Sequence, residues 1–290
     1  MKKVGSFFFS LVPSLLAQGM QFLASFFMIG ISFLTYTTAS SKDIFSLEDT
    51  LYGLWSSTRF NTYLMVIYAV ITIAIFGLWY YIKYDGCYLP KVQTTFHPVS
   101  LVGIVMLVPG MQYLSTYIVA LTASLFPDWL KTYETLIENA GLDSKITFGM
   151  FLYSVLLAPV SEELIFRGVT MRQAKKALPF WGANLLQALL FGIYHMNMVQ
   201  GIYAFCLGLI LGYVCEKGGS IYYSILLHML FNFWGSMLSQ FCSINDSAFS
   251  ILFWFLFAIT MTTGGLLVFR FGLNKRKTFS QQTATNYQYQ

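Results

Sequence analysis

Long apolar segments, separated by short polar ones, run along almost the whole chain. The apolar segments cover about residues 8–35, 61–82, 99–126, 147–166, 182–198, 200–215, 220–240 and 249–272. A helix needs about 20 residues to cross ~30 Å of hydrocarbon, and most of these segments have that length. The pattern therefore predicts an all-α polytopic integral membrane protein with about eight transmembrane helices.

The composition supports this class. The chain is 57% hydrophobic and 10% charged, whereas about a quarter of the residues of a soluble domain are charged. Lys2 and Lys3 precede the first apolar segment, as in a signal peptide, but the segment continues to about Tyr36, which favours a retained first span. The net charge of +5 is spread over short loops, so it does not indicate nucleic acid binding.

One membrane domain, residues 1–277, accounts for nearly the whole chain, and its part at about 147–240 carries the candidate chemistry. The polar segment 278–290 is predicted to be disordered. The longest outer loops are 37–60 and 127–146, and the second includes an amphipathic stretch that predicts a short interfacial helix. Neither an internal repeat nor a second soluble domain is visible in the sequence.

Basic residues divide unevenly between the two sides that eight spans define. If the N-terminus is cytoplasmic, the outer loops hold only Lys42, Arg59, Lys131 and Lys145, and the other 13 of the 17 Lys and Arg residues lie on the inner side. Cytoplasmic loops of membrane proteins are enriched in Lys and Arg. The asymmetry therefore predicts that both termini are cytoplasmic.

Polar and ionisable residues occur in three successive spans. The first set is Glu162, Glu163 and Arg167, the second is His195, and the third is His228 with Asn232. Ionisable groups inside a membrane are costly, so they are functional-site hypotheses by default. These six residues are the candidate catalytic set.

Their spacing predicts which side chains share a helix face. Glu163 and Arg167 are four residues apart and can form a structural ion pair. Glu162 points about 100° away and has no basic residue at that spacing, so it is free for chemistry. A helical hairpin that turns near Lys176–Phe180 would place Glu162 and His195 at the same depth, each ~24 Å from the turn.

Two readings of the chemistry follow. A carboxylate and an imidazole that share a water molecule can deprotonate it for attack on a carbonyl carbon. An imidazole and a carboxamide on one face, His228 and Asn232, can donate hydrogen bonds to the resulting oxyanion. Alternatively, Glu162, His195 and His228 could bind zinc as a two-His, one-carboxylate site. No Ser or Cys adjoins these histidines, which disfavours a covalent nucleophile.

Two smaller features complete this region of the sequence. Pro159 has no N–H, which in an α-helix would leave the carbonyl of Val155 without its donor. Gly208 and Gly212 form a Gly-x-x-x-Gly motif, which predicts close helix packing. The cysteines lack the spacing of a metal or disulfide framework; they are Cys87, Cys206, Cys215 and Cys242.

The three motifs, in this order, resemble the CaaX-protease and bacteriocin-processing (CPBP/ABI) family of intramembrane proteases. The matching motifs are Glu-Glu-x-x-x-Arg, Phe-x-x-x-His and His-x-x-x-Asn, at Glu162 to Arg167, Phe191 to His195, and His228 to Asn232. The resemblance covers about residues 147–240. The family includes the type II CaaX prenyl endopeptidases. It implies an all-helical membrane protease with a cavity inside the bilayer.

The resemblance also implies roles for individual residues. Glu162 and His195 would activate water, and His228 and Asn232 would support the oxyanion. Many members are labelled metalloproteases, but this mechanism needs no metal, so we expect none. Bacterial members are linked to bacteriocin immunity and peptide maturation, and this chain looks bacterial. We therefore expect a membrane-associated peptide or protein substrate, the lipid bilayer as surroundings, no nucleic acid, and a location in the cell membrane.

Two other function classes stay open at this stage. A proton-coupled transporter could use the glutamates and histidines as a proton relay, although all the intramembrane charges lie in one half of the chain and no repeat is visible. A non-catalytic immunity or scaffold protein could keep the fold without the activity, although no catalytic position is missing.

Residues 167–180 are predicted to lie on the cytoplasmic side with both termini. A cysteine introduced as Lys175→Cys should stay unlabelled when a membrane-impermeant maleimide is added to intact cells, and should react after the membrane is permeabilised. Lys145→Cys, in a predicted outer loop, is the matched control and should react in both conditions. Labelling of position 175 from outside intact cells would overturn the orientation.

Overall fold

The computed structural model describes residues 2–39, 58–85, 95–139, 146–238, 244 and 247–288. These residues form helices and no strand, which confirms the predicted all-α class. Most of the predicted outer loop 37–60 lies outside the described residues, as do Cys87 and Cys242.

The helices are mostly α-helical, with four π-helical segments set among them. The α-helices are α1 (Lys2–Phe9), α2 (Val12–Ala39), α4 (Thr58–Tyr80), α6 (Pro98–Leu125), α7 (Pro127–Asn139), α8 (Phe148–Phe151), α9 (Ala158–Glu163), α10 (Met171–Ala174), α11 (Phe180–Tyr194), α12 (Met198–Gly218), α13 (Ile221–Phe233) and α14 (Ala248–Gln288). The π-helical segments are η2 (Tyr81–Asp85), η3 (Leu152–Leu157), η4 (Leu164–Thr170) and η5 (Trp234–Leu238).

The chain is a multi-pass membrane protein. Six helical stretches in the described part are long and apolar enough to cross a membrane. The two other predicted spans coincide with α11, of 15 residues, and with the stretch from Ile221 to Leu238, in which α13 continues without a break into η5. At 1.5 Å per residue α11 is only ~22 Å long and the second stretch at most ~27 Å, both less than the ~30 Å of hydrocarbon. The count of eight spans therefore remains a prediction.

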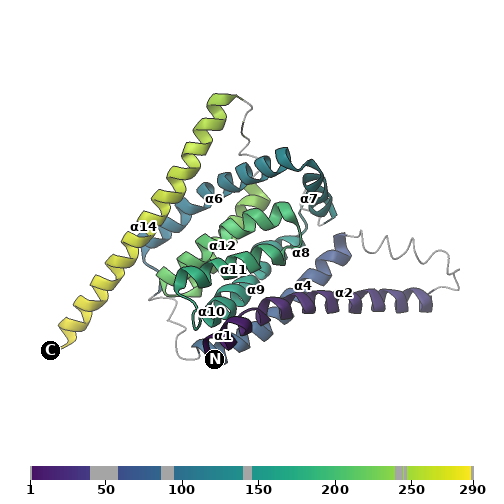
Figure 1. The fold of residues 1–290 in the computed structure, drawn as a ribbon, viewed down its shortest axis with the longest axis horizontal. Coiled ribbons are helices and arrows are strands. Elements are labelled where there is room, and N and C mark those ends of the chain that lie inside the picture. The colour runs from purple at the N-terminus through teal and green to yellow at the C-terminus, as the bar shows by residue number, and fades with distance from the viewer. Residues whose placement is uncertain are drawn as a thin grey trace.

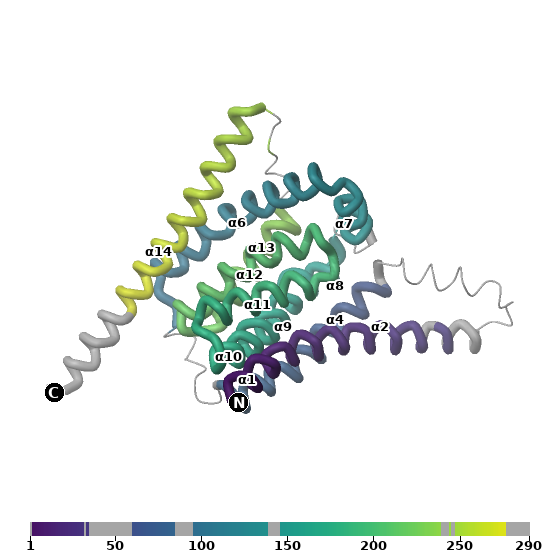
Figure 2. The backbone as a smooth tube through the Cα atoms, viewed as in Figure 1, coloured from purple at the N-terminus to yellow at the C-terminus, as the bar shows by residue number. Residues whose placement is uncertain are grey.

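A single helical stretch, Phe148–Ala174, runs through the middle of the molecule. It is built from α8, η3, α9, η4 and α10, and it contacts α2, α4, α11 and α13. Figure 1 shows α14 beside α6 on one flank of this centre and α2 beside α4 on the other, and the tube in Figure 2 shows the same arrangement. Charged residues in this stretch are therefore shielded from lipid by other helices.

Local sequence sets where the surrounding helices begin and end. The predicted hairpin break is present, since α10 ends and α11 begins after Pro179. The side chains of Asn197, Ser220 and His97 accept backbone N–H groups at the starts of α12, α13 and α6. Gly219, with φ of 68°, ends α12 in the left-handed conformation that glycine adopts without strain. The Ser220 cap fixes the start of α13, the helix that carries His228 and Asn232.

Several elements agree with the sequence and others differ. The amphipathic stretch in loop 127–146 forms α7. Pro13 lies at the start of α2, after a break in the first span, where its missing N–H costs little, whereas α6 continues through Pro109. The helical backbone of α14 extends to Gln288, and the disorder predicted for the segment 278–290 stays a prediction.

Candidate active site

The central helix changes its hydrogen-bond register on both sides of the two glutamates. At the end of η3 the N–H of Ala158 donates to the carbonyl of Tyr153, five residues earlier, and η4 ends with the same spacing. Such π-helical turns are rare and are frequently found at functional sites. Glu162 and Glu163 lie in the short α-helix α9 between these two segments.

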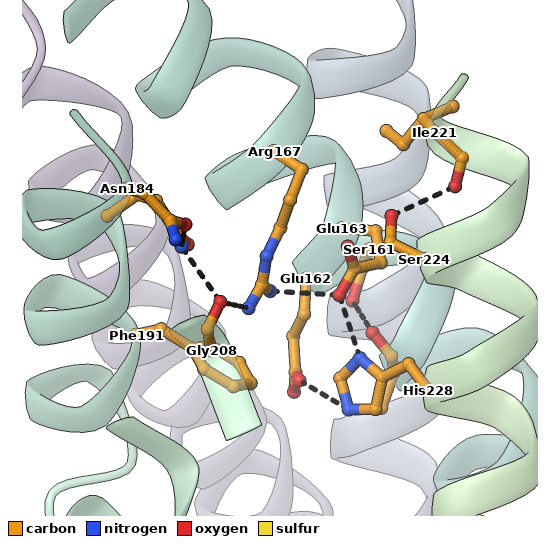
Figure 3. A network of polar contacts seen from close by, with 12 residues as sticks. Ser161, Glu162, Glu163, Arg167, Asn184, Phe191, Gly208, Ile221, Ser224 and His228 are labelled. Carbon is orange, nitrogen blue, oxygen red and sulfur yellow. Dashed lines mark hydrogen bonds and ion pairs between the residues drawn. The ribbon is translucent and has the colours of Figure 1, made fainter. Parts of the chain in front are cut away.

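A fully buried ion pair lies at the centre of the site (Figure 3). Arg167 Nη1 is 2.8 Å from Glu163 Oε1, and both side chains have no exposed surface. The i, i+4 pairing predicted from the sequence is therefore confirmed. The guanidinium also donates through Nη2 to the carbonyl of Gly208 at 3.3 Å, and it lies 4.5 Å from the centre of the Phe191 ring. Both contacts offset part of the cost of burying the charge.

His228 connects the two glutamates. Its Nδ1 lies 3.0 Å from Glu163 Oε1, and its Nε2 lies 3.6 Å from Glu162 Oε2 (Figure 3). Because Glu163 is paired with Arg167, it is an ionised acceptor, so His228 Nδ1 is the donor of the shorter contact. The longer contact exceeds hydrogen-bond length but keeps the Glu162 carboxylate next to the imidazole edge.

Glu162 is buried but is not saturated by hydrogen bonds. Its side chain accepts none from any residue in the described part of the chain, and only His228 pairs with it there. No ion pair joins Glu162 to His195 in the same residues, so the two predicted water-activating groups do not touch. A buried carboxylate whose oxygens accept no hydrogen bond from the protein is suited to take a proton.

His195 is held by the backbone of its own helix. Its Nδ1 lies 2.8 Å from the carbonyl oxygen of Phe191, at the end of α11, and its ring packs edge-on against the Phe191 ring. A carbonyl oxygen only accepts, so Nδ1 carries the hydrogen. In the neutral imidazole Nε2 is then an acceptor, as the water-activating role would need.

Asn232 makes a contact that the sequence did not predict. Its Nδ2 donates to the carbonyl oxygen of Ser154 at 2.9 Å. The earlier expectation that Pro159 frees the carbonyl of Val155 assumed an α-helix. The register at the end of η3 pairs an N–H with the carbonyl five residues earlier. In that register the N–H that proline lacks at position 159 would pair with the carbonyl of Ser154. Asn232 supplies the donor that the proline lacks.

A polar group on α11 was missed by the sequence analysis. Gln187 Nε2 donates to Gly208 O at 2.9 Å and to Asn184 Oδ1 at 2.8 Å, and Asn184 Nδ2 donates to Leu209 O at 3.0 Å. The two amide side chains are three residues apart in an apolar span, and this spacing was the signal available. These hydrogen bonds connect α11 to α12, and the Gly208 carbonyl that accepts from Gln187 also accepts from Arg167.

The close packing predicted for Gly208 and Gly212 is present between these same helices. A Cβ atom added to Gly208 would lie 3.1 Å from the Ala188 Cα, and Gly212 faces Asn184 and Gln187 even more closely. The absence of side chains at these glycines lets the backbone carbonyl of Gly208 reach the site.

The zinc hypothesis finds no matching arrangement. Within the described residues no group of three or more His, Cys, Asp or Glu side chains is placed to hold a metal ion. Glu162, His195 and His228 are thus not gathered as one ligand group in the described structure. Cys206 and Cys215 are free thiols.

Comparison with known families gives one finding. Residues 144–234 match the family model described as type II CAAX prenyl endopeptidase Rce1-like. The matched region contains all six candidate residues, and it confirms the resemblance that the three motifs carry. The match supports a CAAX-type intramembrane protease in general. Neither a curated protein nor a solved structure matches the chain.

The buried ion pair leads to a stability prediction. Glu163→Gln leaves Arg167 charged and unpaired in the interior, so it should destabilise the protein by ~3–5 kcal/mol and lower the melting temperature in detergent. Glu216→Gln is the matched control, because the Lys175–Glu216 pair is partly exposed, and it should cost ~1 kcal/mol or less. Lost activity with an unchanged melting temperature in Glu163→Gln would refute a structural role for this residue.

Proposed function

We propose that this protein is an intramembrane endopeptidase that hydrolyses a peptide bond of a membrane-associated peptide or protein. The observation that carries the proposal is the state of Glu162: it is buried at the centre of the region that matches the protease family, yet accepts no hydrogen bond from the described residues. Its neighbour Glu163 has a guanidinium and an imidazole as partners. Glu162 is therefore the carboxylate left for chemistry.

In the proposed reaction Glu162 removes a proton from a water molecule that His195 Nε2 also holds. The water oxygen bonds to the carbonyl carbon of the substrate, and the carbonyl oxygen becomes an oxyanion. The carbon–nitrogen bond then breaks, and the proton on Glu162 passes to the leaving amine. No ion pair joins Glu162 to His195 in the described residues, and in the proposed reaction the water bridges them; general acid–base catalysis of this kind contributes ~100- to 10,000-fold.

His228 and Asn232 are the proposed oxyanion donors. With Nδ1–H bonded to Glu163, donation by His228 through Nε2 requires the imidazolium form in the proposed mechanism, and Asn232 has a second N–H beyond the one bonded to Ser154. Both residues lie on α13, one turn apart, so their donors face the same region. The role of Arg167 and Glu163 is to hold His228 in place through Nδ1.

The biological setting is also part of the proposal. We infer a cell-membrane location with cytoplasmic termini, from the distribution of basic residues, and a role in bacteriocin immunity or peptide maturation, from the resemblance. A proton-coupled transporter or a non-catalytic scaffold would use the same fold without peptide hydrolysis, and the Glu162→Gln experiment below distinguishes them from the protease.

Glu162→Gln should abolish cleavage while leaving the melting temperature near that of the wild type, because the amide keeps the shape, cannot take the proton and loses no hydrogen bond. The measurement is mass spectrometry of small membrane peptides from cells that carry either version, followed by kinetics on a substrate so found. Glu138→Gln, an exposed residue of α7, is the control. Cleavage at wild-type levels by Glu162→Gln would refute the mechanism, and lost proton flux without a peptide change would favour the transporter.

Removal of metal separates the two chemical readings. If the oxyanion reading holds, the protein should keep full activity after exhaustive chelation, with no stoichiometric metal by mass spectrometry. One zinc per chain, lost together with activity and restored with it, would make Glu162, His195 and His228 ligands instead.

A further inference from the structure

The most unusual backbone feature of the site is the acceptor that Pro159 leaves open. At the end of η3 the N–H of Ala158 pairs with the carbonyl of Tyr153, five residues earlier. The next pair in this register would join position 159 to Ser154, but proline has no N–H. The Ser154 carbonyl accepts instead from Asn232 Nδ2 at 2.9 Å, across to α13.

We propose that Pro159 is a positioning residue: by withholding its N–H it makes the Ser154 carbonyl a fixed acceptor that orients the Asn232 amide for the reaction. This inference rests on the proposed function, and it adds two groups to it, Pro159 and the Ser154 backbone. Neither touches the reacting atoms in the proposed mechanism.

The orientation follows from the hydrogen-bonding groups of a carboxamide. An amide flipped by 180° would bring Oδ1 against the Ser154 carbonyl oxygen, and two acceptors without a proton repel each other. The contact with Ser154 therefore fixes Nδ2 on that side and leaves the second N–H on Nδ2 available to the oxyanion. A backbone N–H at position 159 would share the Ser154 carbonyl with the Asn232 amide and weaken this contact, which loosens the orientation of the second N–H toward the oxyanion.

The same contact joins the two helices that carry the chemistry. Ser154 precedes Glu162 by about two turns of the central helix, and Asn232 follows His228 by one turn of α13. The segments η3 and α13 pack against each other, and Ser154 is buried. A buried carbonyl without a donor is costly, so the chain gains stability as well as orientation from this bond.

Pro159→Ala tests the proposal, because it restores an N–H at position 159 that competes with Asn232 for the Ser154 carbonyl. We expect kcat to fall at least ~10-fold with little change in KM, up to the ~100- to 1,000-fold typical of one lost oxyanion donor. The melting temperature should stay the same or rise, because alanine favours a helix interior over proline. A merely structural proline would not lower kcat in a protein of equal or greater stability. Pro109→Ala, inside α6, is the matched control and should leave kcat unchanged.

A cycle of melting temperatures tests the hydrogen bond without any turnover. Asn232→Ala should lower the melting temperature of the wild type, since it leaves the Ser154 carbonyl without a donor, and should lower it less in the Pro159→Ala background, where the new N–H takes its place. Pro159→Val, which also restores the N–H, replaces Pro159→Ala if the alanine variant does not fold.

The two tests have separate outcomes. Coupled melting temperatures together with the selective loss of kcat support the proposal. Additive melting temperatures, or an unchanged kcat in Pro159→Ala, overturn it. Failure of the proposed function is seen elsewhere, as wild-type cleavage by Glu162→Gln, and does not alter the melting temperatures.

Discussion

The Arg167–Glu163 ion pair, with no surface exposed to solvent or lipid, is the interaction on which the rest of the site depends. A charged pair in the interior loses several kcal/mol of hydration per ion, and its geometry and its additional hydrogen bonds must make up for this. Here each added contact comes from a different helix: Gly208 O from α12, the Phe191 ring from α11 and His228 Nδ1 from α13. The ion pair can be compensated only when these helices are correctly packed, so the pair ties the fold to the site.

This arrangement gives two adjacent glutamates different chemistry. Glu163 faces Arg167 and His228, whereas Glu162, one residue earlier, points about 100° away, and its one ion-pair contact within the described residues is with His228 Nε2, at 3.6 Å. His228 is shared between them. Its Nδ1 bonds to the Glu163 carboxylate, so a change in the charge of the imidazole acts through Nε2 on the Glu162 carboxylate beside it. The structural pair and the proposed chemistry are thus joined through one imidazole.

The sequence predicts the parts of this site that depend on local spacing. The Glu163–Arg167 pair, the hairpin break near Pro179 and the apolar spans follow from periodicities within single helices. The described part of the structure contains the pair, the break and six helical stretches that are long and apolar enough to cross a membrane. The contacts of His228 with both glutamates and of Asn232 with Ser154 join separate helices. They depend on how each helix is rotated about its axis, which an apolar pattern on nearly every face does not fix. The π-helical register was missed for a related reason: it moves the carbonyl opposite Pro159 by one residue, with no change in the pattern.

Backbone carbonyls orient three of the six candidate side chains. Arg167 is bonded to Gly208 O, His195 to Phe191 O and Asn232 to Ser154 O. A carbonyl has no rotamer to order, so it fixes a side chain without the entropy cost of immobilising a second one. It also keeps its chemistry when the side chain of its own residue is substituted, provided that the helix keeps its register. The geometry of the site is therefore set by helix register and packing. This explains why Gly208, Gly212 and Pro159, which are not chemically reactive, lie beside the reactive groups. The glycines determine how closely a carbonyl approaches the site, and the proline determines which carbonyl lacks a backbone donor.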